Sequence, residues 1–84
     1  MYQGETRNVN VICDSDIVGV FIDRFGHDIE IIDKGDKARV RMELEVGPQF
    51  FGWLSGLGKK AYIESPKDIR NDYVSFIEGI LKNY

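Results

Sequence analysis

Cys13 and His27 are the residues of this chain whose types best suit nucleophilic catalysis. A cysteine thiolate beside an imidazole base would form a nucleophile and base pair. The sequence pattern places Cys13 at the end of a strand and His27 after a helix. A helix of about ten residues, at 1.5 Å per residue, separates the two by ~15 Å. We therefore expect a packed cysteine and a solvated loop histidine.

Carboxylates cluster in the loop that follows the first expected strand, at Asp14 and Asp16 on either side of Ser15. Two carboxylates are suitable ligands for a hard cation, but these three residues are also typical helix-capping acceptors. A ferredoxin-like acylphosphatase would need cationic groups and N–H donors in this loop, and carboxylates repel an anionic substrate. We expect helix caps here and no metal site, and an acyl or phosphoryl hydrolase remains a distant alternative.

The glycines Gly52, Gly56 and Gly58 resemble a phosphate-binding loop in composition only, because they fall within and at the end of a helix. Trp53 is a stacking platform in principle, but a large aromatic residue at helical spacing is more often part of a core. We expect it to be buried against the last helix or the fourth strand. The sequence thus predicts a chain that is not an enzyme, with no catalytic residue, no metal and no cofactor.

The elements that must position these residues follow from hydrophobic periodicity. Strands are expected over residues 8–13, 29–33, 38–46 and 60–64, and helices over residues 15–25, 48–57 and 66–82. Residues 34–37 supply turn chemistry between the second and third strands. Ser65 is expected to cap the last helix, with Pro66 in its first position. The order predicts an α+β fold, a ferredoxin-like βαββαβ sandwich with a four-stranded antiparallel sheet and an added C-terminal helix.

The expected third strand alternates apolar residues with charged ones, so that Arg39, Arg41, Glu43 and Glu45 share its exposed face. Two positive charges followed by two negative charges form a self-complementary strip. The same sheet face is expected to carry the apolar residues Ile12, Ile32 and Tyr62. We predict that these seven residues contact a second copy of the chain, or that effector phosphates reach Arg39 and Arg41.

Length and charge limit the remaining possibilities. The 84 residues allow one domain, assigned to residues 7–84, with residues 1–6 as a disordered lead-in. A net charge of −3 argues against duplex DNA binding by this fragment alone. One cysteine excludes an internal disulfide, and no apolar run approaches the ~20 residues that cross a bilayer. We expect no targeting signal and no membrane partner.

The run W-L-S-G-L-G-K-K-A-Y-I-E-S-P over residues 53–66, followed by Ile69-Arg70 and a terminal Tyr84, resembles a known family. It is similar to the C-terminal extension, or WCX domain, of WYL-domain transcription regulators of the DeoR-like helix-turn-helix group. The resemblance covers about residues 7–84. It implies a dimerisation and effector-response module of a cytoplasmic bacterial regulator that forms homodimers. The winged helix-turn-helix and the WYL domain would lie upstream, and the WYL domain would take a nucleotide or nucleic acid effector. An ACT-like domain that senses a small molecule is the alternative.

Overall fold

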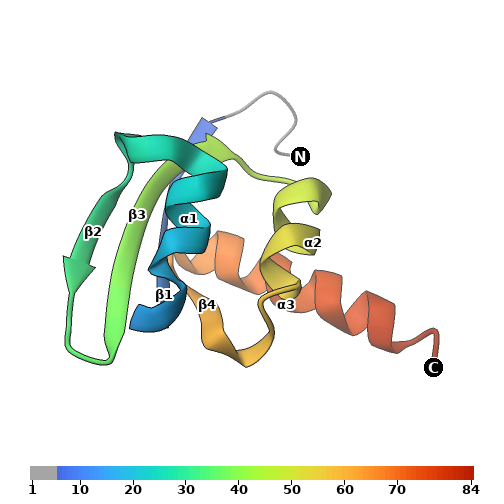
Figure 1. Ribbon diagram of the computed structural model, residues 1–84. Helices are drawn as coiled ribbons and strands as arrows, with labels where there is room; N and C mark the ends of the chain where they lie inside the picture. The colour runs from blue at the N-terminus through green and yellow to red at the C-terminus, as the bar shows by residue number, and fades with distance from the viewer. Residues whose placement is uncertain (1–5) are drawn as a thin grey trace.

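Two long antiparallel strands form the centre of the molecule. In the computed structural model, which describes residues 6–84, β1 (Thr6–Asp14) pairs with β3 (Lys37–Glu45) along the full length of both strands. The short strand β2 (Glu30–Asp33) joins the outer side of β3, and β4 (Ala61–Ser65) joins the outer side of β1. The sheet order is therefore β2-β3-β1-β4, with every pair antiparallel (Figure 1).

Two crossover helices lie on one face of this sheet (Figure 1). α1 (Val18–Phe25) connects β1 to β2, and α2 (Pro48–Ser55) connects β3 to β4. Three short 3-10 turns, η1 (Ser15–Ile17), η2 (Gly26–Asp28) and η3 (Gly58–Lys60), complete the connections. The arrangement confirms the expected ferredoxin-like fold.

The core lies between the sheet and the two crossover helices. The third strand alternates buried residues with more exposed ones, as its sequence predicts, and β1 contributes Val9, Val11 and Cys13 to the same core face. Side chains that are fully enclosed come from both strands and from all three helices: Val9, Val11, Cys13, Phe21, Val40, Met42, Leu54 and Ile69. The opposite face of the sheet is left to solvent.

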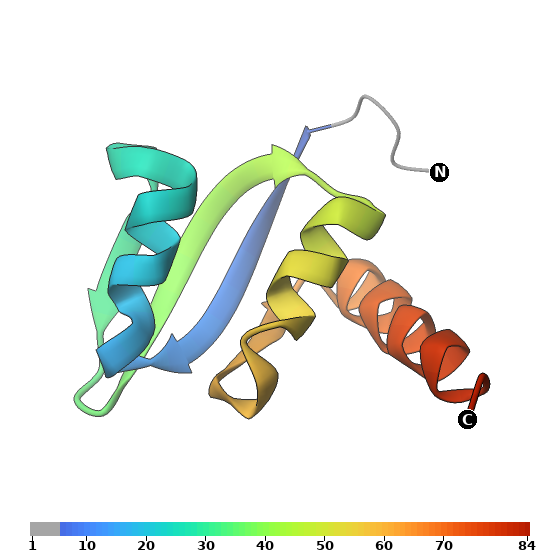
Figure 2. The ribbon, with the colours of Figure 1, turned by 45° about the vertical axis from the view of Figure 1, so that its right-hand side comes forward.

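The third helix, α3 (Lys67–Leu81), runs beside β4 and against α2. Ile69 and Tyr73 enter the core, and the ring of Phe51 on α2 lies 5.4 Å from that of Tyr73 and 5.6 Å from that of Phe76. Past Phe76 the helix continues away from the rest of the domain (Figure 2). The helix therefore shields the outer edge of β4 but leaves the open face of the sheet uncovered.

The expected start of the last helix is wrong. Pro66 is the residue before the first helical turn, and its carbonyl accepts the backbone N–H of Arg70. The Ser65–Pro66 peptide bond is cis, and the Ser65 hydroxyl makes no capping bond. It accepts instead a hydrogen bond from the Asn10 amide at 2.9 Å. Ser65 therefore ties β4 to β1 and does not begin α3.

The expected first helix also differs in its start. A 3-10 turn occupies residues 15–17, and the α-helix begins only at Val18, with no side-chain cap from Asp14 or Ile17. The proposed lead-in, residues 1–6, falls mostly outside the described residues, and Thr6 already belongs to β1. The first expected helix ends at Gly26, which has φ 79°, whereas α2 ends at Ser55, three residues before Gly58 and its φ of 64°.

Candidate interaction surface

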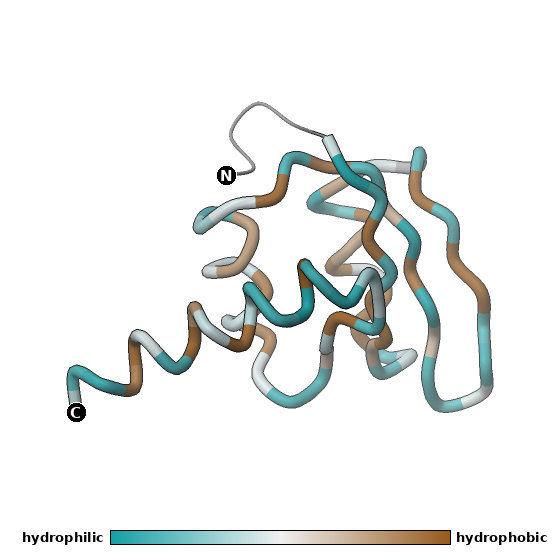
Figure 3. The backbone as a smooth tube through the Cα atoms, turned by 180° about the vertical axis from the view of Figure 1, so that it is seen from behind, coloured by the Kyte–Doolittle hydropathy of each residue, from teal (hydrophilic) through white to brown (hydrophobic). Residues whose placement is uncertain are grey.

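The open face of the sheet brings all seven predicted contact residues together. Cross-strand pairing aligns Ile32, Arg39, Ile12 and Tyr62 in one row that crosses the four strands. Arg41, Glu43 and Glu45 follow along β3 on the same side, and all three are exposed. The view from behind shows hydrophilic and hydrophobic residues alternating along these strands (Figure 3). The seven residues therefore share one face of the sheet, as the strand alternation predicts.

Arg39 has a partner that the sequence did not reveal. Its Nε lies 2.7 Å from Oε1 of Glu64 and its Nη2 lies 3.0 Å from Oε2, so the guanidinium binds the carboxylate through two parallel hydrogen bonds. This geometry is the strongest that an arginine and a carboxylate adopt. The Glu64 hydrogen bond raises the pKa of Arg39, and the Arg39 hydrogen bond lowers the pKa of Glu64.

A β-bulge places Glu64 where Arg39 can reach it. Asn10 pairs with Ser65, whereas the next residue, Val11, pairs with Ile63, so Glu64 is one extra residue on β4. A bulge of this kind redirects a side chain. The Glu64 carboxylate consequently meets a guanidinium that comes from β3, two strands away.

Ile12 offers little apolar surface for the predicted contact. Ile12 lies on the open face, opposite both Arg39 and Tyr62, yet only 7% of it is exposed. The Arg39 side chain must pass over β1 at this position to reach Glu64, and its methylene groups cover apolar surface on the way. Of the three apolar residues predicted for this face, only Ile32 and Tyr62 are exposed, at 50% and 53%.

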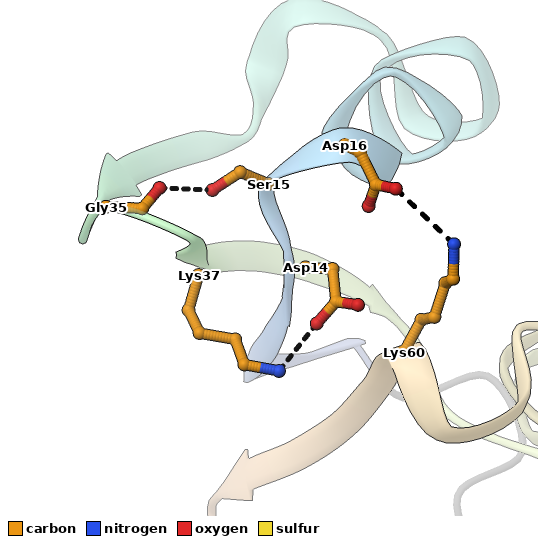
Figure 4. Close-up of polar contacts among 6 residues, drawn as sticks. All are labelled: Asp14, Ser15, Asp16, Gly35, Lys37 and Lys60. Carbon is orange, nitrogen blue, oxygen red and sulfur yellow. Dashed lines mark hydrogen bonds and ion pairs between the residues drawn. The ribbon is translucent and has the colours of Figure 1, made fainter.

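The carboxylates at the end of β1 are held by lysines (Figure 4). Asp14 forms an ion pair with Lys37 at 2.5 Å, and Asp16 forms one with Lys60 at 3.4 Å. The hydrogen bond to Asp14 is also the largest cause of the raised pKa of Lys37. Neither aspartate caps a helix, so the capping prediction is wrong for both.

Ser15 makes two hydrogen bonds in the same loop. Its hydroxyl donates to the carbonyl of Gly35 at 2.7 Å (Figure 4). Its backbone N–H donates to the carbonyl of Asp36. These bonds join the start of the first connection to the β2–β3 turn. A shallow pocket here is lined by three aspartates, one serine and one lysine, so an anionic substrate would be repelled. Among residues 6–84 no group of three or more potential ligands is placed to hold a metal ion.

A groove between the start of α2 and α3 was not foreseen. It encloses about 710 Å³, and its apolar lining comes from Val46, Pro48, Phe50, Phe51 and Phe76. The groove depends on where α3 crosses α2, a relation that no local pattern in the sequence encodes. No residue of the predicted site lines it except Glu45.

Comparison with known proteins identifies the chain. A model of the WCX domain matches residues 5–81, which is nearly the whole sequence. The chain belongs to the WCX family. No curated protein and no solved structure matches it. The WCX domain is the C-terminal domain of WYL-type regulators, so the match favours this interpretation over the ACT-like alternative.

The cysteine of this WCX domain is a core residue. Cys13 is completely buried, and its burial is the main reason that its pKa is raised. A protonated, enclosed thiol is a poor nucleophile. Its position at the end of β1 agrees with the expected packed cysteine.

Trp53 of the WCX domain packs against a different element from the one predicted. Its ring lies edge-on to Phe21 and to Phe25, with both centroid distances at 5.2 Å. It is half-buried, and it stacks beside Phe50 at 6.4 Å. The prediction of a packing role is therefore confirmed, whereas the expected contact with the last helix or fourth strand is wrong: the tryptophan joins α2 to α1.

Proposed function

We propose that this WCX domain is the C-terminal dimerisation and effector-response module of a bacterial WYL-type transcription regulator, and that it has no catalytic activity of its own. The observation that carries the proposal is the WCX match over residues 5–81. The regulator would bind its operator through an upstream helix-turn-helix and its nucleotide or nucleic acid effector through an upstream WYL domain. Its place of action would be the cytoplasm.

The groups that resemble catalytic residues support a non-catalytic role. Cys13 is buried and protonated, and the two aspartates of the first loop are engaged by Lys37 and Lys60. A net charge of −3 supports the assignment of duplex DNA binding to another domain. None of the helices among residues 6–84 is long and apolar enough to cross a membrane.

The charges of the open face favour a protein partner over a phosphate group. Arg39 is engaged by Glu64, and Lys37 by Asp14. The exposed charged residues that remain on this face are Arg41 and the carboxylates Glu30, Glu43 and Glu45. An anionic effector would meet more negative than positive charge there.

Reading the coding sequence upstream of Met1 tests the proposal. We expect the frame to continue into a WYL domain and a helix-turn-helix. An upstream enzyme domain would contradict the regulatory role. In the full-length regulator, removal of this domain should reduce dimer formation and abolish the response of operator binding to the effector, as measured by sedimentation and by fluorescence anisotropy of labelled operator.

A further inference from the structure

The second half of α3 exposes apolar side chains that the rest of the domain does not cover. Every residue from Ile77 to Tyr84 is exposed, and Figure 3 shows hydrophobic residues recurring along this half of the helix. The α-helix ends at Leu81, and a final turn follows in which the N–H of Tyr84 donates to the carbonyl of Leu81. A short helical segment is marginally stable in water unless another surface packs against it.

These exposed residues form a stripe distinct from the one that packs into the core. The core stripe has the spacing four, three along Ile69, Tyr73 and Phe76. Ile80 continues its spacing but lies beyond the covered part of the helix and is 46% exposed. A second stripe, shifted by one residue and hence by about 100° around the helix, has the spacing three, four, three. It consists of Val74 (47% exposed), Ile77 (39%), Leu81 (67%) and Tyr84 (100%). Alternating steps of three and four are the pattern by which two helices pack together.

We propose that this outer stripe, Val74, Ile77, Leu81 and Tyr84, is the surface that binds a second copy of the chain, with the two α3 helices antiparallel about a two-fold axis. The inference rests on the dimerisation role proposed above and names the surface that performs it. It replaces the open face of the sheet as the principal site of self-association.

The stripe is self-complementary in the antiparallel orientation. We place the two-fold axis level with the midpoint between Ile77 and Leu81. Ile77 then faces Leu81 of the partner subunit. In the same register Val74 faces Tyr84 of the partner subunit. Each of the four residues then has an apolar partner, and the two-fold axis repeats both contacts. No charged side chain belongs to the stripe from Val74 onwards.

The available area suits a modest dimer. The exposed fractions of these four side chains amount to a patch of several hundred Å², the scale at which an exposed apolar patch marks an interaction site. Two such patches together approach the ~1,200 Å² at the lower end of specific interfaces. The charged residues of this half, Glu78 and Lys82, are of opposite sign and are one turn apart, so they add no net charge beside the interface.

The open face offers less apolar surface to a second copy. Its two exposed apolar residues, Ile32 and Tyr62, lie on the edge strands β2 and β4, with β3 and β1 between them. Ile12, between them, is covered, and Arg39 is already paired. Ion pairs formed in water across the remaining strip would contribute little.

Sedimentation equilibrium of the 84-residue chain tests the proposal. We expect the wild type to form dimers at high micromolar concentration. Leu81→Glu should raise the dimer dissociation constant at least about tenfold, because a carboxylate would be desolvated in an apolar contact. Asn83→Glu is the matched control, since it adds the same charge in the same turn on the opposite side of α3. Arg41→Glu tests the open face in parallel. Far-ultraviolet circular dichroism of each variant verifies that the fold is retained.

The outcomes separate this inference from the proposed function. Loss of the dimer in Leu81→Glu, with dimers retained in Asn83→Glu and Arg41→Glu, supports the α3 interface. Dimers that survive Leu81→Glu but are lost in Arg41→Glu overturn the α3 interface and leave the dimerisation role intact. A wild type that remains monomeric overturns both the interface and self-association by this domain, whatever an upstream domain may bind.

Cross-linking tests the orientation of the two helices. An Ile77→Cys variant mixed with a Leu81→Cys variant should form an oxidised heterodimer more readily than either variant alone, because the antiparallel register pairs those two positions. Cys13 is buried and should not compete. Cross-linking by each variant alone, with no gain on mixing, would contradict this register.

Discussion

The guanidinium of Arg39 and the carboxylate of Glu64 meet across the whole width of β1, although their strands are not neighbours. The pair links β3 to β4 on the side of the sheet that has no helix. It covers Ile12 and removes one of the two arginines that would otherwise be available to a ligand. A cross-strand ion pair thus takes part of the role that a covering helix has on the other face.

The Arg39–Glu64 pair should make a small contribution to stability that depends on pH. The pair lowers the pKa of Glu64, so the folded state holds its ionised form more strongly than the unfolded chain does. The stabilisation is present above the unfolded pKa, about 4.3, and is lost as the pH falls through the folded pKa. Thermal midpoints of wild type and Glu64→Gln should therefore differ slightly at pH 7 and converge as the pH falls through the lowered pKa of Glu64. Since both side chains are about one-third exposed, the difference should also shrink in high salt.

Ser65→Ala should destabilise the domain by about 1 kcal/mol through the loss of the Asn10 hydrogen bond. In a domain of this size that corresponds to a lower thermal midpoint by roughly 4 to 8 °C. The reason differs from helix capping, and a double-mutant cycle with Asn10→Ala distinguishes the two. Non-additive losses are expected from the observed bond, whereas strictly additive losses would show that Ser65 acts through another group.

Gly58→Ala and Gly52→Ala should have opposite effects on stability. Gly58 has φ 64°, a left-handed conformation that costs a residue with a side chain about 1 kcal/mol. Gly52 lies inside α2, and a Cβ there would meet no atom within 4 Å. Alanine at position 52 should therefore be neutral or stabilising by up to about 1 kcal/mol. Urea denaturation of the two variants measures both effects, and equal losses would contradict the assignment of the strained position.

The Cys13 thiol should react slowly with a thiol reagent in the folded protein. Burial encloses the sulfur and raises its pKa, so little thiolate is present and little is accessible at pH 8. Labelling with an aromatic disulfide should be fast in concentrated urea. Without urea, the labelling rate should be limited by the rate at which the domain unfolds. Rapid labelling of the folded chain would indicate that β1 ends differently from the structure described above.

The parts of the structure that sequence reasoning reached are those with a local periodic signal. Alternation along β3 predicted which of its side chains are buried and which are more exposed. The partner of Arg39 was beyond such reasoning, because the bulge at Glu64 adds a residue to β4 without disturbing the apolar pattern. The loop aspartates resembled caps for a similar reason: their true partners, Lys37 and Lys60, come from elements distant in sequence.

The two stripes of α3 show how far periodicity alone reaches. Ile69, Tyr73, Phe76, Ile77, Ile80 and Tyr84 read as one amphipathic face in the sequence. The spacing does not reveal how much of α3 packs against α2, and it therefore does not reveal which of these side chains stay uncovered. Phe51 packs against Tyr73 and Phe76, and every residue from Ile77 onwards is exposed, so the covered part ends at Phe76. The spacing of Val74, Ile77, Leu81 and Tyr84 was a readable signal of the second stripe.

The shortness of β2 bears on aggregation. Its outer edge is free to accept another strand, and its central residues, Ile31 and Ile32, are exposed. Antiparallel pairing of two such edges about their centre would set Glu30 of one copy against Asp33 of the partner subunit at both ends. Like charges in those positions oppose edge-to-edge growth of the sheet. At the other edge of the sheet, α3 packs beside β4, so the described edges do not invite strand addition equally.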